Sequence, residues 1–164
     1  MSGEPMKKLK LLCLFLLVLT SCHLMIPTVA AAPAFAADLT AYTKVNAVTA
    51  KAADELQAYV KTEQAFSRSL TSLSRTYPVL VRRYRAALDD LNDATKRIVR
   101  DQDASDRLLA SVVKLASQKH TNAAWVLLKH SAVGQKRFLD TIGRAQLLME
   151  RCMLLHAQLA RLKA

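Results

Sequence analysis

The sequence contains few residues that turn or cross-link a chain. It has three glycines, four prolines and three cysteines in 164 residues, and beyond residue 37 only Pro78, Gly134, Gly143 and Cys152 remain of these. Scarce turns exclude a fold of many short elements, and one cysteine cannot form a disulfide within its own chain. No stretch alternates cleanly between apolar and polar residues, and no Asn-Gly or Asp-Gly hairpin dipeptide occurs. The composition predicts an all-α protein.

The sequence also lacks the short motifs of common catalytic and cofactor sites. No serine lies in a Gly-x-Ser-x-Gly turn, no glycine-rich phosphate loop is present, and no Cys-x-x-Cys-His pattern for haem attachment occurs. Glu63 is the only acidic residue at a position expected to face the core, and no second carboxylate is expected level with it for acid–base catalysis. We therefore expect no enzyme activity, no catalytic residues and no cofactor.

The first residues have the features of an export signal. Lys7, Lys8 and Lys10 precede an unbroken apolar run from Leu11 to Leu19, and Ala34-Phe35-Ala36 has the small-x-small form that signal peptidases cleave. This pattern predicts a signal peptide over residues 1–36 and one mature domain over residues 37–164. The protein is then expected in the periplasm or outside the cell.

A second interpretation of the same region excludes the first. Leu19-Thr20-Ser21-Cys22 resembles the bacterial lipoprotein box, in which residues 1–21 are removed and the cysteine is acylated, so that Cys22 anchors the protein to a membrane. The stretch from His23 to Ala37 stays apolar, whereas a lipoprotein tether is usually polar, and this favours cleavage after Ala36. Lipidation at Cys22 and an uncleaved anchor both remain open.

Three long helices are predicted from apolar residues spaced three and four apart. One pattern runs from Tyr42 to Tyr77, a second from Val81 to Ala116, and a third follows the polar segment 117–122. Pro78 separates the first two helices. The predicted helices cover residues 38–76, 78–117 and 122–163, and short connections between equal rods predict an elongated up-down-up three-helix antiparallel bundle of coiled-coil character. A polar cluster over residues 101–106 is a candidate break in the second helix, although its i,i+4 charge pairs favour continuity.

Polar residues on the apolar stripes allow a prediction of which side chains lie level. Folding the chain about Tyr77-Pro78 and near His120 places Glu63 opposite Thr95 and Gln146. The same construction places Gln102 and Ser105 level with residues 49–53 and with Gly134 and Gln135. Buried polar groups need hydrogen-bonding partners at their own height, so we expect two polar layers that set the pairing of the helices.

The C-terminal part of the third helix is apolar nearly all round. Leu147 and Leu154 lie on the side away from the predicted seam, so we expect them to be exposed in a monomer. Exposed leucines at helical spacing indicate a surface for a partner protein or for self-association. The sequence thus predicts partner binding through the C-terminal helix.

Positive charge is concentrated in the same third of the chain. Residues 37–164 hold 21 basic and 12 acidic residues, and residues 119–164 alone hold eight basic and two acidic ones. An ordered stripe on the third helix consists of Lys129, Lys136, Arg137, Arg144 and Arg151. For an exported protein the available polyanions are acidic lipids and envelope polymers, so the stripe indicates an anionic surface and nucleic acid is not expected as a partner.

Four residues of the third helix are weak candidates for a metal site. Met149, Cys152, Met153 and His156 share one helical face, and soft sulfur with imidazole suits Cu(I). Methionine and cysteine on an apolar stripe are ordinarily core residues, which favours packing over metal binding.

Taken together, these patterns predict an exported, non-enzymatic cell-envelope protein that acts as a binding, adaptor or scaffold component of a secretion or envelope assembly. The alternative is a peripheral binder of anionic membrane surface, and periplasmic copper binding is a lesser alternative.

Overall fold

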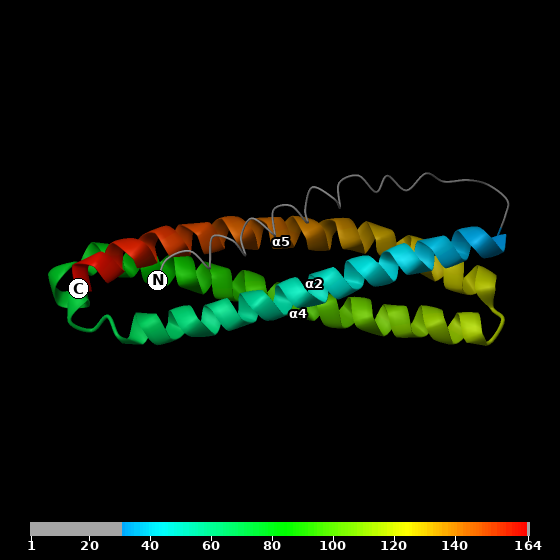
Figure 1. Cartoon of the computed structure of the whole chain (residues 1–164), viewed down its shortest axis with the longest axis horizontal. Coiled ribbons are helices and arrows are strands. Elements are labelled where there is room, and N and C mark those ends of the chain that lie inside the picture. The colour runs from blue at the N-terminus through cyan, green and yellow to red at the C-terminus, as the bar shows by residue number, and fades with distance from the viewer. Residues whose placement is uncertain (1–30, 164) are drawn as a thin grey trace.

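The computed structural model describes residues 31–163, which are helical apart from short connections at residues 69–72, 77 and 118–120. The elements are α2 (Ala31–Arg68), α3 (Leu73–Thr76), α4 (Pro78–Ser117) and α5 (Thr121–Lys163). The expectation of an all-α chain is confirmed for these residues. The three long helices lie side by side in one elongated body, with α4 running back along α2 and α5 running back along α4 (Figure 1). Among the described residues, no helix has the length and apolar character needed to cross a membrane.

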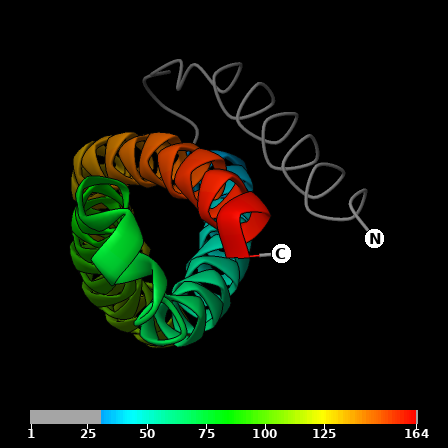
Figure 2. The same ribbon diagram turned by 90° about the vertical axis from the view of Figure 1, so that its left-hand side faces the viewer.

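Viewed along the long axis of the body, the helices are arranged in a ring (Figure 2). Their buried apolar side chains form two core clusters. Helices α4 and α5 share the most extensive interface, and α2 packs more on α4 than on α5. The larger core cluster includes the fully buried side chains of Leu70, Tyr84, Leu91, Ile98 and Leu159. A second cluster lies beside the α4–α5 connection and consists of Phe35, Tyr42, Val112, Ala124 and Leu128.

The first long helix ends earlier than the sequence pattern indicates. We expected it to continue to residue 76, but α2 ends at Arg68 and a turn over residues 69–72 leads into α3. Ser69 Oγ donates to the Phe66 carbonyl at 2.8 Å, and Ser74 Oγ donates to the Thr71 carbonyl at 2.7 Å. Serine and threonine hydroxyls offer the backbone alternatives to helical hydrogen bonds, and several of them fall together here. Leu70 in this turn is buried, and the turn makes α2 shorter at its C-terminal end than predicted.

Helix α4 is a single helix through the polar segment 101–106. Tyr77, the residue before its first proline, has φ −127° and ψ 58°, outside the helical region. Steric clash with the proline ring disfavours a helical residue there, and Pro78 itself suits the first position of a helix because no N–H is needed. The sequence signal at Tyr77-Pro78 therefore places the start of α4 correctly.

The α4–α5 connection is tight and includes a left-handed residue. Lys119 has φ 62°, its N–H bonds the Ala116 carbonyl at 3.1 Å, and the N–H of His120 bonds the Leu115 carbonyl at 2.9 Å. These two bonds are the Schellman pattern that closes the C-terminus of many helices, usually with glycine at the left-handed position. The short closure forces α5 to return along α4.

Candidate functional site

The outward side of α5 carries two strongly exposed leucines. Leu147 is 68% exposed and Leu154 is 69% exposed, seven residues apart on the same face. Ala145 and Cys152, on the opposite face of the same helix, are fully buried against the core. The leucines predicted to be exposed are therefore exposed in the folded chain.

The predicted cations lie on the same outward side as the leucines. Arg144 lies three residues before Leu147, and Arg151 lies four residues after it and three before Leu154, so all four are neighbours on one helical surface. Lys129, Lys136 and Arg137 continue the positive surface toward the start of α5 and are also exposed. Within residues 31–163, none of these five cations forms an ion pair. We call Arg144, Leu147, Arg151 and Leu154 the α5 outer face; the sequence suggested its leucines and cations as separate features, and the fold joins them.

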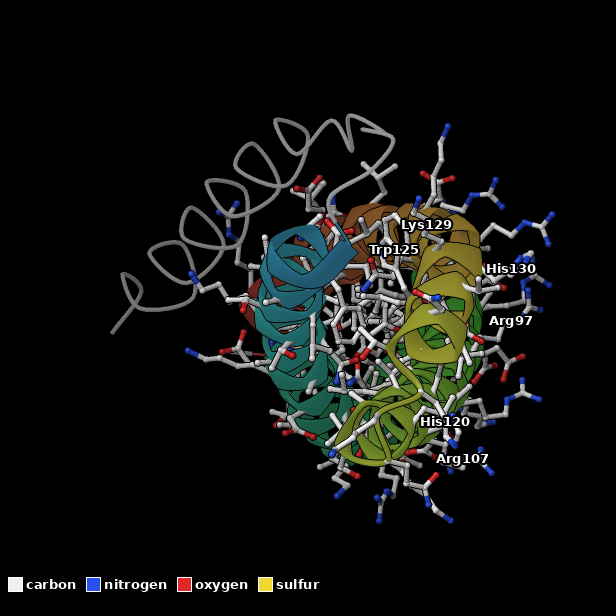
Figure 3. All side chains as sticks on the ribbon, turned by 90° about the vertical axis from the view of Figure 1, so that its right-hand side faces the viewer. Arg97, Arg107, His120, Trp125, Lys129 and His130 are labelled. Carbon is white, nitrogen blue, oxygen red and sulfur yellow. The ribbon has the colours of Figure 1, made fainter. Side chains whose placement is uncertain are left out.

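Lys129 differs from the other cations because it lies over an aromatic ring. Its Nζ is 3.7 Å from the centroid of the Trp125 ring, and Trp125 Nε1 donates to Asp38 Oδ2 at 3.1 Å. Figure 3 shows Trp125 and Lys129 together at the end of the body that holds the α4–α5 connection. The indole thus links α5 to the beginning of α2, and the Lys129 charge is partly satisfied within the protein.

A buried acid, a tyrosine and a histidine form the most chemically distinctive cluster inside the protein. Glu63 on α2 is 4% exposed, and its Oε2 lies 2.7 Å from the Tyr84 hydroxyl on α4 and 2.8 Å from Nδ1 of His156 on α5. A carboxylate accepts hydrogen bonds, so the tyrosine O–H and the histidine Nδ1–H are the donors. Phe66 stacks on the His156 ring with centroids 3.8 Å apart. The cluster connects all three long helices at one level.

The electrostatics of this cluster keep its weak acids protonated. Burial, followed by the hydrogen bond to Glu63, raises the pKa of Tyr84 far above its ordinary value, and burial followed by the Glu63 charge does the same to the pKa of Tyr59. Burial also raises the pKa of the Cys152 thiol to about 11, with the Glu63 charge as the next cause. The Tyr59 hydroxyl is buried and has no hydrogen-bond partner among the described residues.

The predicted partners of Glu63 are wrong. Thr95 donates instead to the Leu91 carbonyl of its own helix at 2.8 Å, and the buried Nε2 of Gln146 has no hydrogen-bond partner in the described chain. At about 1.5 Å of rise per residue, Thr95 lies about 16 Å along α4 from Tyr84, and Gln146 about 15 Å along α5 from His156. A simple reversal at Tyr77-Pro78 gave the wrong level because α2 ends at Arg68 and a turn over residues 69–72 follows. Sequence reasoning identified the buried acid and missed Tyr84, which it assigned only to the apolar stripe.

The second predicted polar layer is present between α2 and α4. Thr49 Oγ1 donates to Gln102 Oε1 at 2.8 Å, and Gln102 Nε2 donates to Asn46 Oδ1 at 3.1 Å. Ser105 Oγ donates to the same Asn46 oxygen at 2.6 Å, and Asn46 Nδ2 donates to Asp106 Oδ1 at 2.6 Å. No hydrogen bond from this network to Gly134 or Gln135 is found among the described residues, so the layer joins two helices and not three.

The geometry around the four weak metal candidates disfavours a copper site. Nδ1 of His156 is used by Glu63, and the raised pKa of the Cys152 thiol opposes the thiolate that a metal ligand requires. In the described part of the chain, no three histidine, cysteine, aspartate or glutamate residues gather as a metal-binding group. Met149 and Cys152 instead belong to the core and its border, as ordinary packing predicts.

A shallow groove of about 610 Å³ lies between α2 and α4, with Val60, Thr95 and Val99 among its lining residues. Its cationic side chains Lys61, Lys96 and Arg100 are exposed, and Lys96 is paired with Asp93 at 3.2 Å. The groove is polar at its edge and broadly open, so it shows no enclosed binding cavity.

Comparison of the chain with protein-family models, curated proteins and solved structures finds no match. The predicted lipidation residue, Cys22, and the predicted signal up to Ala30 lie outside the described residues. The α5 outer face, in contrast, lies wholly within the described residues, and we take it as the candidate site.

Proposed function

We propose that this chain is an exported, non-enzymatic component of the cell envelope that binds another envelope protein, or a second copy of itself, through the α5 outer face. In this proposal an N-terminal signal directs export, and the mature part is an elongated, coiled-coil-like up-down-up antiparallel bundle. The bundle acts as a binding, adaptor or scaffold element of a secretion or envelope assembly.

The observation that carries the proposal is the 68% and 69% exposure of Leu147 and Leu154 beside Arg144 and Arg151. Single exposed apolar residues are normal on protein surfaces. Two leucines lie one heptad apart on a long helix, beside two arginines that form no ion pair within residues 31–163. Helical partners use surfaces of this kind, with apolar contact at the centre and charge beside it. Val79 and Val113 on α4 are also exposed, at 58% and 51%, but they lie at distant points of their helix.

Photocross-linking in intact cells tests this proposal directly. A photoreactive residue replaces Glu150, between the two leucines, and a second chain has the same residue in place of the exposed Ala86 on α4. We expect a discrete cross-linked product from position 150 and none from position 86. Adding Leu147→Gln and Leu154→Gln should abolish the product, whereas the matched control with Val79→Gln and Val113→Gln should retain it. A product of equal yield from both positions, or one unaffected by the leucine changes, contradicts the proposal.

A second candidate function is docking on an anionic membrane surface. The exposed stripe of Lys129, Lys136, Arg137, Arg144 and Arg151 on α5 favours it. The two functions respond oppositely to salt, because charge–charge attraction is screened while apolar association persists or strengthens. Co-sedimentation of the purified chain with phosphatidylglycerol vesicles at rising ionic strength separates them. Binding that is lost at high salt and on replacing Arg144 and Arg151 with glutamine, but not on replacing the leucines, supports lipid docking over protein binding.

A further inference from the structure

The start of α2 is part of the folded core, although the small-x-small pattern predicts cleavage within it. Phe35 is 7% exposed and packs in the second core cluster with Tyr42, Val112 and Leu128. The apolar spacing of α2 also extends upstream of its predicted beginning, because Phe35, Leu39 and Tyr42 follow each other at intervals of four and three. A cut after Ala36 removes an aromatic side chain from the protein interior.

Two hydrogen bonds close to Phe35 also depend on an intact N-terminal part of α2. Asp38 accepts the Trp125 indole N–H at 3.1 Å, and the Thr40 hydroxyl donates to the Ala36 carbonyl at 2.8 Å. Cleavage after Ala36 places Asp38 second from a free terminus, where helices fray, and puts a positive amino group at the positive end of the helix dipole. The Trp125 link between α2 and α5 then loses its rigid support.

The lengths of the helices agree with this dependence. Helix α2 has 38 residues, α4 has 40 and α5 has 43. With its first turns included, α2 is therefore long enough to reach the end of the body that holds the α4–α5 connection. In Figure 1 the first turns of α2 lie at that end of the body. A chain beginning at residue 37 keeps Tyr42 in this cluster but leaves Val112, Ala124 and Leu128 without Phe35.

We propose that the exported protein retains Phe35 in its fold and is held at a membrane by acylation of Cys22, rather than released by cleavage after Ala36. The proposal rests on the export step of the proposed function. The motif Leu19-Thr20-Ser21-Cys22, directly after the apolar run, places the processing point upstream of Phe35 and leaves every residue of α2 in the mature chain.

The chemistry needs a phosphatidylglycerol-type phospholipid as co-reactant. The Cys22 sulfur forms a thioether bond to the diacylglyceryl carbon, the bond from that carbon to the phosphate oxygen breaks, and glycerol phosphate leaves with the thiol proton. Water then hydrolyses the Ser21–Cys22 peptide bond, and the new amino group takes an acyl chain from a second phospholipid, which leaves as a lysophospholipid. The diacylglyceryl group alone supplies two chains, enough for stable anchoring where a single chain binds only weakly.

The end of the body that this anchor brings to the membrane is suited to anionic headgroups. It carries the exposed side chains of Lys114, Lys119 and Lys129. Trp125 lies beside Lys129 (Figure 3). Cations near an acidic lipid surface add attraction, and tryptophan is favoured at membrane interfaces. The opposite end, with Glu63 and His156, then points away from the membrane.

Intact mass of the full chain purified with detergent from a bacterial envelope tests the proposal. We expect a chain that begins at Cys22 and carries the mass of a diacylglyceryl group and one acyl chain, and we expect Cys22→Ser to lack both lipid and cleavage at this point. A chain that begins at Ala37, an uncleaved chain, or a chain that keeps Phe35 with Cys22 absent or unmodified overturns it. Cell fractionation in the same experiment reports export separately, so a soluble exported chain contradicts the lipid anchor without contradicting the proposed function.

Thermal unfolding of two purified chains tests the structural premise without a membrane. One chain begins at His23 and the other at Ala37. We expect the shorter chain to melt lower by about 10 °C, the order of loss for one buried aromatic residue in a domain of this size. Phe35→Ala in the longer chain should reproduce most of this shift, while Ala37→Ser, at an exposed neighbouring position, should not. Equal melting of the two chains overturns the proposal.

Discussion

Oε2 of Glu63 lies 2.8 Å from Nδ1 of His156, and this contact joins α2 to α5, which pack less on each other than either packs on α4. The Tyr84 hydroxyl approaches the same oxygen at 2.7 Å from α4. One buried carboxylate oxygen therefore receives donors from both neighbouring helices. Such a cluster is costly if any member is left unpaired, so it favours a single alignment of the three rods.

Replacing Glu63 with leucine should destabilise the protein by about 2 kcal/mol, because the His156 N–H loses its acceptor and the Tyr84 hydroxyl loses its charged one. The Tyr84 hydroxyl keeps only the backbone carbonyl of residue 63, 3.0 Å away. Urea unfolding followed by circular dichroism measures this loss. Glu55→Leu, an exposed position on the same helix, is the matched control and should change stability by less than about 0.5 kcal/mol. Adding Tyr84→Phe to Glu63→Leu should cost less than the two single losses together, since both changes remove the same hydrogen bond between the Tyr84 hydroxyl and the Glu63 carboxylate. Strict additivity contradicts the shared-acceptor interpretation.

Removing the Thr49 hydroxyl from the hydrogen-bond network around Asn46 and Gln102 should lower the free energy of unfolding measurably. Thr49→Val keeps the shape of the side chain but leaves the buried Gln102 Oε1 without the donor that lies 2.8 Å away, so we expect a loss of about 1 kcal/mol. Thr62→Val is the control on the same helix, because the exposed Thr62 hydroxyl donates only to the Ala58 carbonyl at 3.1 Å. Denaturant midpoints of the two variants should differ, and equal midpoints contradict a structural role for the network.

The left-handed residue in the α4–α5 connection offers a stabilising substitution. Lys119 has φ 62°, where a side chain carries a steric cost that glycine lacks, so Lys119→Gly should raise the free energy of unfolding by up to about 1 kcal/mol. The gain is partly offset by the greater freedom of glycine in the unfolded chain. Lys114→Gly, one turn earlier inside α4, should instead destabilise by about 1 kcal/mol. Melting temperatures that move in the same direction for both variants contradict the assignment of the turn.

Stability should fall in alkaline solution through Cys152. Burial and the Glu63 charge raise the pKa of its thiol from 9.0 to about 11, so the folded chain holds the proton more tightly than the unfolded chain. The stabilisation is complete below pH 9, is lost as pH rises from 9 to 11, and changes no further above that range. The raised pKa values of Tyr59 and Tyr84 add a further loss above pH 10.

Urea midpoints of the wild-type chain and of Cys152→Ala between pH 7 and 10 measure the cysteine contribution. The alanine variant should be less stable at pH 7 and should lose less stability between pH 9 and 10, where tyrosine ionisation in the unfolded chain is only beginning. Parallel pH curves for the two chains would show that the Cys152 thiol has the same pKa folded and unfolded.

Local features of the chain were readable from the sequence because they depend on near neighbours. The scarcity of glycine and proline predicted helices, Tyr77-Pro78 placed the beginning of α4, and the stripe spacing identified Glu63 as a buried acid and Leu147 and Leu154 as outward residues. The sequence also predicted Gln102 level with residues 49–53, and Thr49 does contact Gln102. This prediction tolerated a small error in the axial level of the helices because it named a range of residues on the first helix.

The partners of Glu63 depended on information that no local pattern contains. The hydroxyls of residues 69–74 end α2 before Leu73, and this small loss of helix changes the level at which α2 meets its neighbours. At the level that results, the donors at the buried carboxylate are Tyr84 and His156. The incorporation of Phe35 into the core was equally hidden, because its three-residue setting matches a cleavage signal and only the packing against Val112 and Leu128 reveals an interior position.

The sequence by itself determined that this protein is helical, where α4 begins, and which faces of the helices are apolar, because backbone propensity and periodicity act over one or two turns. Only the tertiary structure decided that Glu63 meets Tyr84 and His156 and that Phe35 belongs to the core. Those relationships depend on the axial offset and rotation of whole rods, which are set by the summed packing of many side chains and the exact end of α2, not by any short segment.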